Sequence, residues 1–490
     1  MIHRTCLPVL ILLSLLQTTV NAQPDSVWAR IFDVGGWDEC SDVIPLSDGG
    51  FALVGHTLGE EALQEQIYVM TTDSGGNPNQ AMSYGGGFMD MGSTLLQQND
   101  GSLLVAGWSH ISNETEQNIR LIGVGLDLQA GWAQSFGGSS QERCYSMLQN
   151  HDGNIIMAGY TSSFGAGLSD FWLLCANTFG DSLWSRTYGD SELQECYSIS
   201  ETSDGGYLLA GYTGSNSNDD DDFLAVRVDN LGNIIWQRTF GGDEQDKCFD
   251  CLETSDGGFL LAGRTSSFGA GGKDAWIVRA NSAGDSLWSR TFGGTFDDSF
   301  QSICLRPDGG FILGGWTDSF AEHNADMWLV RIDANGDLLW DRTYGGRSSA
   351  SWDECTAVKE TPDGGFILAG STGYAPGEWQ DSDFLLIKIG ADPMDVEHSP
   401  PFLPDGFELQ AFPNPFNSVS TIRLTVPFSQ NIRLSVYNIQ GRMIQEIVRG
   451  PMNLGTHYLT FVGEAFPSGT YFMNLQGEYY GATQKLILLK

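Results

Sequence analysis

A short phrase, Asp-Gly followed by an apolar run, recurs through most of the chain at a nearly fixed interval. Its seven aspartates are Asp48, Asp100, Asp152, Asp204, Asp256, Asp308 and Asp363. The first six are 52 residues apart and the last step is 55. A second phrase, Trp-x-Arg-x-aromatic-Gly, keeps the same interval from Trp184 to Trp340. A fixed period of this length is typical of repeat architectures, so we expect a series of seven equivalent units.

One unit reads as four short strands. In residues 191–242, four runs of about 5 to 7 residues with β character are separated by turns rich in Gly, Asp and Asn. No window shows the periodicity of a helix. Four antiparallel strands in each repeat of about 50 residues are typical of a propeller blade. The sequence therefore predicts an all-β chain whose main part is a seven-bladed β-propeller of four-stranded blades.

The two ends of the repeat region indicate how the ring closes. The seventh repeat has no Trp strand after residues 384–389, whereas a Trp strand around Trp28 begins the mature chain before any first blade strand. We expect this N-terminal strand to complete the seventh blade, which removes the exposed strand edges of an open sheet. Gln80 stands where the period places a Trp, and it is one of the few departures from the repeat.

Four blades carry the phrase Asp/Asn-x-x-Gly-x-x-x-Trp, as in the stretches that end at Trp236 and Trp340. This phrase resembles the tryptophan-docking motif of quinoprotein-like propellers. The resemblance implies that each indole packs against the neighbouring blade. It does not extend to quinone chemistry, because those enzymes usually have eight blades and a cofactor site that this chain does not show. We therefore expect no organic cofactor.

The chain divides into four segments. Residues 1–22 combine a positive start, a short apolar core and a small-residue cleavage site, which predicts a secretory signal peptide. Residues 23–393 form the propeller, and residues 394–407 form a linker rich in Pro and acidic residues. Residues 408–490 contain alternating apolar residues in six or seven short runs, which predicts a small Ig-like β-sandwich. No later apolar run is long enough to span a membrane.

The last segment contains several recognisable motifs in order. They include Pro-Asn-Pro-Phe-Asn at residues 413–417, Val-Tyr-Asn-Ile-Gln-Gly-Arg at residues 436–442, and a Lys-Leu-Ile-Leu-Leu-Lys ending. This segment resembles the C-terminal sorting domain, type A, of substrates of the type IX secretion system. The resemblance implies Sec export followed by passage to the outer cell surface or the medium, with the type IX machinery as a partner. It assigns the sorting signal to Pro413, Asn414, Pro415, Gly469, Tyr471, Lys485 and Lys490.

Charge and cysteine content limit the classes of partner. The chain has a formal net charge of −37, and the propeller with its linker carries −39, because the two ends of the chain are slightly basic. An acidic surface repels phosphate groups, so we expect no nucleic-acid partner. Cysteines recur at one position of five blades, eight residues before the Asp-Gly aspartate. Equivalent positions in different blades are too far apart for a disulfide, so we expect mostly free, buried thiols.

An acidic residue occupies one further position in six of the seven blades, and Gln194 occupies it in the other. The six residues of this acidic ring are Asp38, Asp90, Glu142, Asp246, Asp298 and Asp353. If their strand is the innermost one, the side chains surround one mouth of the axial channel. One interpretation is a metal site, for which Ca²⁺ is the expected ion because it binds carboxylate oxygens. The other is that each carboxylate accepts hydrogen bonds from the backbone of its own Gly-rich loop.

The sequence contains no recognisable catalytic motif. The propeller histidines lack metal-ligand spacing, and there is no nucleophile elbow or phosphate-binding loop. One aromatic loop, with Tyr374 and Trp379, breaks the repeat and could stack against a sugar ring. We therefore expect a non-catalytic binding or adhesion protein for a glycan, protein or matrix ligand. The alternative is a secreted carbohydrate-active hydrolase, since paired carboxylates are always available in so acidic a chain.

Overall fold

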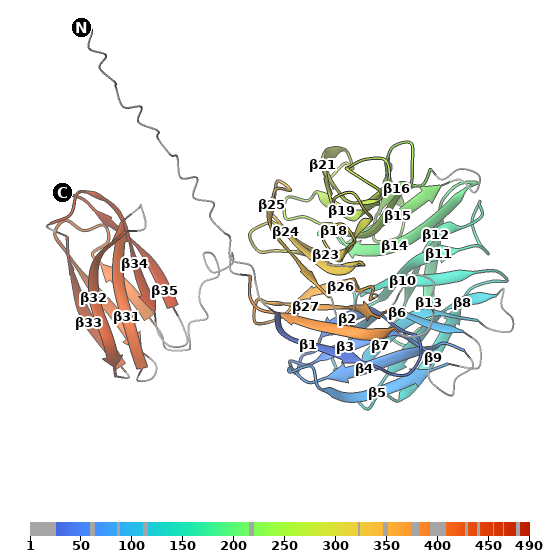
Figure 1. Cartoon of the computed structure of the whole chain (residues 1–490), viewed down its shortest axis with the longest axis horizontal. Helices are drawn as coiled ribbons and strands as arrows, with labels where there is room; N and C mark the ends of the chain where they lie inside the picture. Colours follow the sequence, from blue (N-terminus) through green and yellow to red (C-terminus); the bar gives the residue numbers. More distant parts are fainter. Residues whose placement is uncertain are drawn as a thin grey trace, which may run out of the picture. The chain divides into compact units, whose positions relative to one another are not determined.

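The computed structural model describes most of the chain outside its N-terminus, its linker and several loops (Figure 1). The described residues are 26–58, 64–85, 89–110, 116–214, 220–321, 324–345, 351–373, 382–392, 408–426, 430–438, 442–453, 455–463, 465–476 and 481–490. They form β-strands and turns, and no helix occurs among them. The chain divides into two compact units, residues 1–394 and 395–490. The expected signal peptide and linker lie outside the described residues.

The first unit contains seven four-stranded antiparallel sheets, which confirms the predicted propeller. Blades 1 to 3 are β2 (Asp38–Pro45), β3 (Phe51–Thr57), β4 (Gln66–Thr72), β5 (Pro78–Tyr84); β6 (Asp90–Gln97), β7 (Leu103–His110), β8 (Gln117–Val124), β9 (Ala130–Phe136); and β10 (Glu142–Gln149), β11 (Ile155–Thr161), β12 (Asp170–Ala176), β13 (Ser182–Tyr188). Blades 4 to 6 are β14 (Leu193–Glu201), β15 (Tyr207–Gly214), β16 (Asp222–Val228), β17 (Ile234–Phe240); β18 (Asp246–Glu253), β19 (Phe259–Thr265), β20 (Asp274–Ala280), β21 (Ser286–Phe292); and β22 (Asp298–Leu305), β23 (Phe311–Thr317), β24 (Asp326–Ile332), β25 (Leu338–Tyr344). Blade 7 is β26 (Glu354–Glu360), β27 (Phe366–Thr372), β28 (Asp383–Ile389) and the N-terminal strand β1 (Ser26–Phe32).

The N-terminal strand closes the ring as predicted. β1 pairs antiparallel with β28, with Phe32 opposite Phe384 and Ser26 opposite Ile389. It supplies the outermost strand of blade 7, the place that the Trp strand takes in the other blades. Trp28 lies opposite Lys388, as Trp236 lies opposite Arg227 in blade 4. The seventh blade therefore joins residues from both ends of the repeat region.

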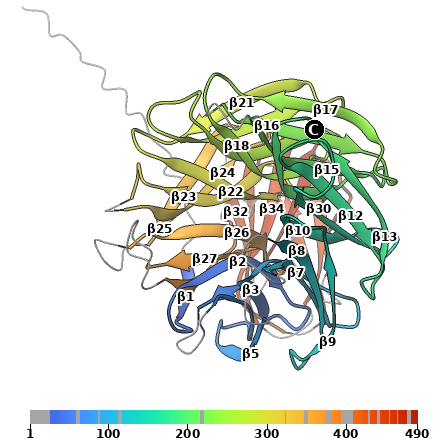
Figure 2. The same ribbon diagram turned by 90° about the vertical axis from the view of Figure 1, so that its right-hand side faces the viewer.

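The first six blades run from the axis to the rim in chain order, and blade 7 does so except for its outermost strand β1. In Figure 2 the fourth strands, such as β5, β13 and β21, lie on the rim. The first strand of each blade contacts the first strand of the next all the way around the ring. Each of these inner strands contains a β-bulge, for example between Cys40 and Asp42 in β2. The same register shift occurs in all seven blades. A bulge leaves one residue unpaired in the ladder and turns its side chain away from the regular pattern.

The apolar cores lie between neighbouring blades. The Trp of one blade packs against a glycine turn of the next, as the resemblance to tryptophan-docking propellers implies. Gly76 has a φ of 72°, and a Cβ there would lie 2.6 Å from the Trp28 ring. Gly284 has a φ of 81° and would meet the Trp236 ring at 2.8 Å in the same way. Glycine is therefore required at this turn for two reasons, the backbone conformation and the nearby indole.

The junction of blades 1 and 2 departs from this rule at both partners. Gln80 replaces the Trp of blade 1, and Leu128 replaces the turn glycine of blade 2. Leu128 is 1% exposed and has a φ of 56°, the left-handed conformation that glycine adopts in the equivalent turns. Its side chain packs among apolar residues of blades 1 and 2 and takes up part of the space that an indole occupies at the other junctions. Gln80 itself is exposed.

The eight cysteines of the described chain are all free, as expected. Seven are buried and Cys304 is partly exposed. Burial raises the pKa of the Cys144 and Cys355 thiols to about 12. These thiols are therefore uncharged and unreactive, and they act as small apolar groups in the packing between blades.

The second unit is a two-sheet β-sandwich. Its strands are β29 (Glu408–Phe412), β30 (Val419–Val426), β31 (Gln430–Asn438), β32 (Met443–Met452), β33 (Gly455–Val462), β34 (Gly469–Gln476) and β35 (Gly481–Leu488). One sheet has the order β29-β30-β33 and the other the order β32-β31-β34-β35. Side chains such as Ile422, Leu434 and Phe461 form its own buried core.

Candidate functional site

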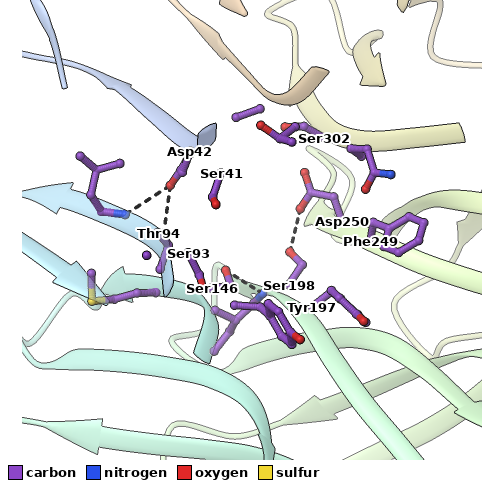
Figure 3. Close-up of a pocket in the computed structure, with 18 of the residues that line it drawn as sticks. Ser41, Asp42, Ser93, Thr94, Ser146, Tyr197, Ser198, Phe249, Asp250 and Ser302 are labelled. Atoms are coloured by element: carbon purple, nitrogen blue, oxygen red, sulfur yellow. Dashed lines mark hydrogen bonds between the residues drawn. The ribbon is translucent and has the colours of Figure 1, made fainter. Parts of the chain in front are cut away.

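The inner strands enclose a cavity of about 820 Å³ on the axis of the propeller. Residues from the first strand of all seven blades line it, including Asp42, Thr94, Tyr145, Ser198, Gln301 and Thr356. Figure 3 shows part of this lining, with Asp42 and Asp250 on different strands around the opening. A cavity of this size lies in the range of small-molecule sites. The inner strands therefore form a channel that is large enough for a small ligand and is lined by side chains from every blade.

The unpaired residue of each bulge faces this channel, and we call it the channel position. Around the ring the seven residues are Ser41, Ser93, Tyr145, Tyr197, Phe249, Gln301 and Thr356. Three consecutive blades thus carry aromatic rings, and the other four carry small or polar groups. The channel wall is therefore strongly asymmetric although the scaffold around it repeats.

The aromatic half of the wall is a connected set of rings. Tyr145 and Tyr197 stack with their centroids 4.6 Å apart and an angle of 22° between their planes. Phe249 meets Tyr197 edge to face at 5.5 Å. Tyr212 lies behind Tyr197 at 5.9 Å. All three channel rings are partly exposed, so they offer apolar surface to the channel.

Three cations contact aromatic rings of this half of the wall. Arg143 Nη1 donates to the Tyr145 hydroxyl at 3.4 Å, and its guanidinium lies 4.2 Å from the centre of the Trp108 ring. The Arg264 guanidinium lies 5.4 Å from the Phe249 ring. Lys247 Nζ lies 4.0 Å from the Tyr212 ring and 3.0 Å from Asp221 Oδ2. Cation–π contacts of this kind hold aromatic side chains in fixed positions.

Two carboxylates lie at equivalent places in the neighbouring blades 7 and 1, on Glu354 and Glu39. Burial, with the added charge of Glu39, raises the pKa of Glu354 to about 7. Burial also raises the pKa of Glu39, whose Oε1 accepts a hydrogen bond from Trp37 Nε1 at 2.8 Å. His56 Nε2 lies 3.7 Å from Glu39, but burial lowers the pKa of His56 to about 4, so this contact is not an ion pair at pH 7. A carboxyl group that is half-protonated at neutral pH is a feature of many binding and catalytic sites.

The residue after the channel position is polar in six of the seven blades, and these residues form a girdle of hydrogen bonds between neighbouring blades. Asp250 Oδ2 accepts from the backbone N–H of Ile303 at 2.7 Å, and Ser198 Oγ donates to Asp250 Oδ1 at 2.7 Å. Thr94 Oγ1 likewise donates to Asp42 Oδ2 at 3.0 Å. The bulge supplies the free N–H groups for these bonds. This girdle fixes the diameter of the channel while leaving hydroxyl groups along its wall.

The acidic ring lies on the same strands, but its side chains turn away from the cavity. None of its six members lines the cavity. Glu142 Oε2 accepts from the Gly138 N–H at 2.7 Å, and Glu142 Oε1 accepts from the Thr161 hydroxyl at 2.9 Å. Asp298 is bound by Gly294, Ser319 and Thr317 in the same way. Asp38, Glu142, Asp246 and Asp298 are fully buried. The bonds to Glu142 and Asp298 compensate the water that these two carboxylates lose.

The hydrogen bonds within each loop correspond to the second interpretation made from the sequence. Metal binding by the ring is not tested by this arrangement and stays a prediction. Among the described residues, one group has carboxylate oxygens within 4.8 Å of one another, namely Asp33, Asp38 and Asp383 at the junction of blades 7 and 1.

Tyr374 and Trp379, predicted to bind a ligand, lie outside the described residues.

The predicted sorting residues meet near the end of the sandwich. Asn414 Nδ2 donates to the backbone oxygen of Lys485 at 2.7 Å, and Asn414 Oδ1 accepts from Ile487 at 2.9 Å. Tyr471 donates its hydroxyl to the Pro467 carbonyl at 2.7 Å, and the Lys490 N–H donates to Ser468 Oγ. Gly469 opens β34 opposite Leu488. Pro413 and Pro415 flank Asn414.

Sequence reasoning missed the aromatic channel wall. The signal was present, because Tyr145, Tyr197 and Phe249 fall at one repeat position where the other blades have small or polar residues. Only the bulge, which cannot be read from the hydrophobic pattern, reveals that this position faces the channel.

The comparisons with known proteins identify the second unit. A search of the curated proteins finds no match. Among solved structures, Sqt1 from Chaetomium thermophilum matches with 13% identity and a TM-score of 0.43, covering 75% of this chain and 99% of Sqt1. A puromycin hydrolase matches with 13% identity and a TM-score of 0.44, covering 79% of this chain and 58% of the hydrolase. Among the described residues no helix is long and apolar enough to cross a membrane. Residues 410–489 match the family model described as "Secretion system C-terminal sorting domain", so the β-sandwich is a type IX sorting domain and the chain is a secreted propeller protein.

Proposed function

We propose that this exported propeller is a non-catalytic binding protein that holds a glycan in its axial channel. The observation that carries the proposal is the asymmetric wall, with Tyr145, Tyr197 and Phe249 on one side and hydroxyl and amide groups on the other. Sugar rings present apolar C–H faces that pack on aromatic rings and hydroxyl groups that need polar partners. Ser41, Ser93 and Gln301 offer such partners across the channel.

The experiment is a glycan-array screen of the mature chain, followed by calorimetric titration of the best ligand. Tyr197→Ala removes the central ring and is expected to weaken binding about tenfold or more. Tyr458→Ala is the control, because it removes an exposed tyrosine of the sorting domain that does not line the channel. Equal losses for the two variants, or no glycan bound at all, would contradict the proposal.

A hydrolase is the second candidate, favoured by the two neighbouring carboxyl groups of Glu39 and Glu354. A carboxyl group with a pKa of about 7 can donate a proton at neutral pH, and a second carboxylate beside it is the usual partner in glycoside hydrolysis. Incubating the wild-type chain with the glycan that it binds, and measuring released reducing ends, separates the two functions. Release that disappears in Glu354→Gln supports the hydrolase, whereas tight binding without release supports the binding protein.

Calcium binding by the acidic ring can be tested on the same sample. A thermal midpoint that falls on addition of EDTA and recovers with excess Ca²⁺ supports a structural ion. An unchanged midpoint leaves the ring carboxylates as acceptors for the hydrogen bonds of their own loops.

A further inference from the structure

The aspartate of the Asp-Gly turn has a basic partner in blades 4 to 7. In blade 6, Arg331 Nη2 lies 2.5 Å from Asp308 Oδ2, and the Arg331 side chain is fully buried. The equivalent pairs are Arg227 with Asp204, Arg279 with Asp256 and Lys388 with Asp363. Each base lies on the third strand of its blade, opposite the Trp of the fourth strand. Four blades thus place a cation beneath the turn from inside the protein.

Blades 1, 2 and 3 lack this cation, and in blade 3 the buried Cys175 stands opposite Trp184 in its place. The register of the sheets puts Thr71 and Gly123 where Arg227 stands in blade 4, with Ala52 and Leu104 opposite them. The turn aspartates Asp48 and Asp100 are exposed, and the described residues place no base in ion-pair contact with either. Within the described part of the chain, they accept hydrogen bonds from their own turns, such as the bond from Gly50 N to Asp48 Oδ1 at 2.9 Å. Ser102 N donates to Asp100 Oδ1 at 3.0 Å in the same way.

A cleft lies at each of these two places. The first, of about 390 Å³, is lined by Asp48 and Thr71 together with the amides of Asn79, Gln80 and Gln97. It exists because Thr71 and Gln80 are both shorter than the Arg and Trp that occupy the same register pair in blades 4 to 6.

The second cleft, of about 470 Å³, is lined by Asp100 and Gly123 together with the rings of Trp132 and Phe179. Phe179 is 71% exposed. The two clefts share Gly125, so they are neighbours.

We propose that these two clefts bind arginine side chains of a partner polypeptide, which supply from outside the guanidinium that blades 4 to 6 supply from within. The internal pairs are the template, because they show what a turn aspartate of this geometry accepts. A planar guanidinium has five N–H donors, enough for the aspartate and for the amide oxygens of the first cleft. It also stacks on aromatic rings such as those of the second cleft. The net charge of −37 attracts a basic partner.

This inference is independent of ligand binding in the channel, because no residue of either cleft lines the axial cavity. The test is a calorimetric titration of the full mature chain with a short blocked peptide that contains two arginines. The same peptide with citrulline, a neutral isostere of arginine, and with lysine are the comparison ligands. The arginine peptide is expected to bind about tenfold or more tightly than the citrulline peptide.

Two variants locate the binding. Asp48→Asn together with Asp100→Asn should reduce the affinity for the arginine peptide about tenfold or more. Thr71→Arg should fill the first cleft from within, raise the thermal midpoint and weaken peptide binding. Asp204→Asn is the matched control, since Arg227 already occupies that turn, and it should leave the peptide affinity unchanged.

Equal binding of the arginine and citrulline peptides would overturn the proposal, as would unchanged affinity in the double asparagine variant. Equal binding of the lysine peptide would overturn the selectivity for a guanidinium. The asparagine variants keep the proposal testable even if Thr71→Arg fails to fold, because they change exposed groups at the surface of the turns.

Discussion

The acidic ring and the channel position lie three residues apart on the inner strands, and they differ in how much the residue varies from blade to blade. The acidic ring is nearly constant, and Glu142 and Asp298 are saturated by hydrogen bonds from their own loops. The channel position changes from Ser41 to Tyr197 to Gln301 around the ring. A position that every blade needs for folding stays uniform, whereas a position free of that need can diverge. In a repeat protein, uniformity therefore indicates structure and asymmetry indicates where to look for a ligand.

The largest effect is expected where a repeated interior pair is broken. Arg331→Ala removes the buried partner of Asp308 and of Asp392, and Asp392 is itself fully buried. Leaving that carboxylate without its cation should lower the free energy of unfolding by about 3–5 kcal/mol, measured by urea denaturation. Arg238→Ala, which breaks an exposed pair at 3.6 Å, is the control and should cost under about 1 kcal/mol. Similar losses in the two variants would contradict the importance of the buried pair.

The junction of blades 1 and 2 tests whether Leu128 compensates for the absence of a Trp at position 80. Leu128→Gly should destabilise the propeller by about 2–4 kcal/mol, because it empties the space that the leucine fills. Gln80→Trp alone should also destabilise it, by about 1–3 kcal/mol, since the indole meets Leu128. The double variant places a Trp opposite a turn glycine, as Trp28 and Gly76 are placed at the junction of blades 7 and 1, so it should be more stable than the two single losses predict. Additive losses in a double-mutant cycle would contradict the exchange.

Changing one residue of the acidic ring and one residue of the channel position tests whether the first serves stability and the second serves ligand binding. Asp298→Asn removes a fully buried acceptor and should lower the free energy of unfolding by about 1–3 kcal/mol without altering affinity for a channel ligand. Tyr197→Ala should do the reverse, weakening the ligand while costing less stability. Chemical denaturation and ligand titration of both variants check this. The distinction between the two sets fails if Asp298→Asn also abolishes ligand binding.

The smallest expected effect is a pH dependence from carboxyl groups with raised pKa values. The pKa of Glu354 is about 7 against an ordinary 4.5, and burial and neighbouring acids raise that of Asp222 to about 6. A raised pKa means that the folded chain binds protons more tightly than the unfolded chain. Stability from these groups is therefore present at acid pH and falls as the pH rises from about 4.5 to 7.

Glu354→Gln should flatten that part of the stability profile, as measured by urea denaturation at several pH values. Glu354→Asp, which keeps a carboxyl group at this position, is the control and should retain the slope. An identical slope in wild type and Glu354→Gln would show that Glu354 does not titrate in this range.

The period of the Asp-Gly phrase was enough to predict seven four-stranded blades, and the displaced strand at Trp28 was enough to predict the closure of the ring. Both are set by local turn chemistry and by chain order. The aromatic wall could not be predicted, because a bulge in each inner strand turns one unpaired residue toward the channel. The hydrophobic pattern of the sequence does not show where that bulge lies. The missing cations at Thr71 and Gly123 also escaped notice. Their meaning depends on the register between third and fourth strands, which aligns Arg227 with Trp236 only in the folded sheet.

Pairing of β1 with β28 has a consequence for export. The first strand of the propeller finds its partner only when the last strand has been made, more than 350 residues later. Contacts this distant in sequence form slowly, because a long loop must close before they contribute stability. An incomplete chain therefore forms an open ring in which β1 has no strand to pair with. Only a chain that extends through residue 389 can close blade 7, so ring closure separates complete propellers from incomplete ones.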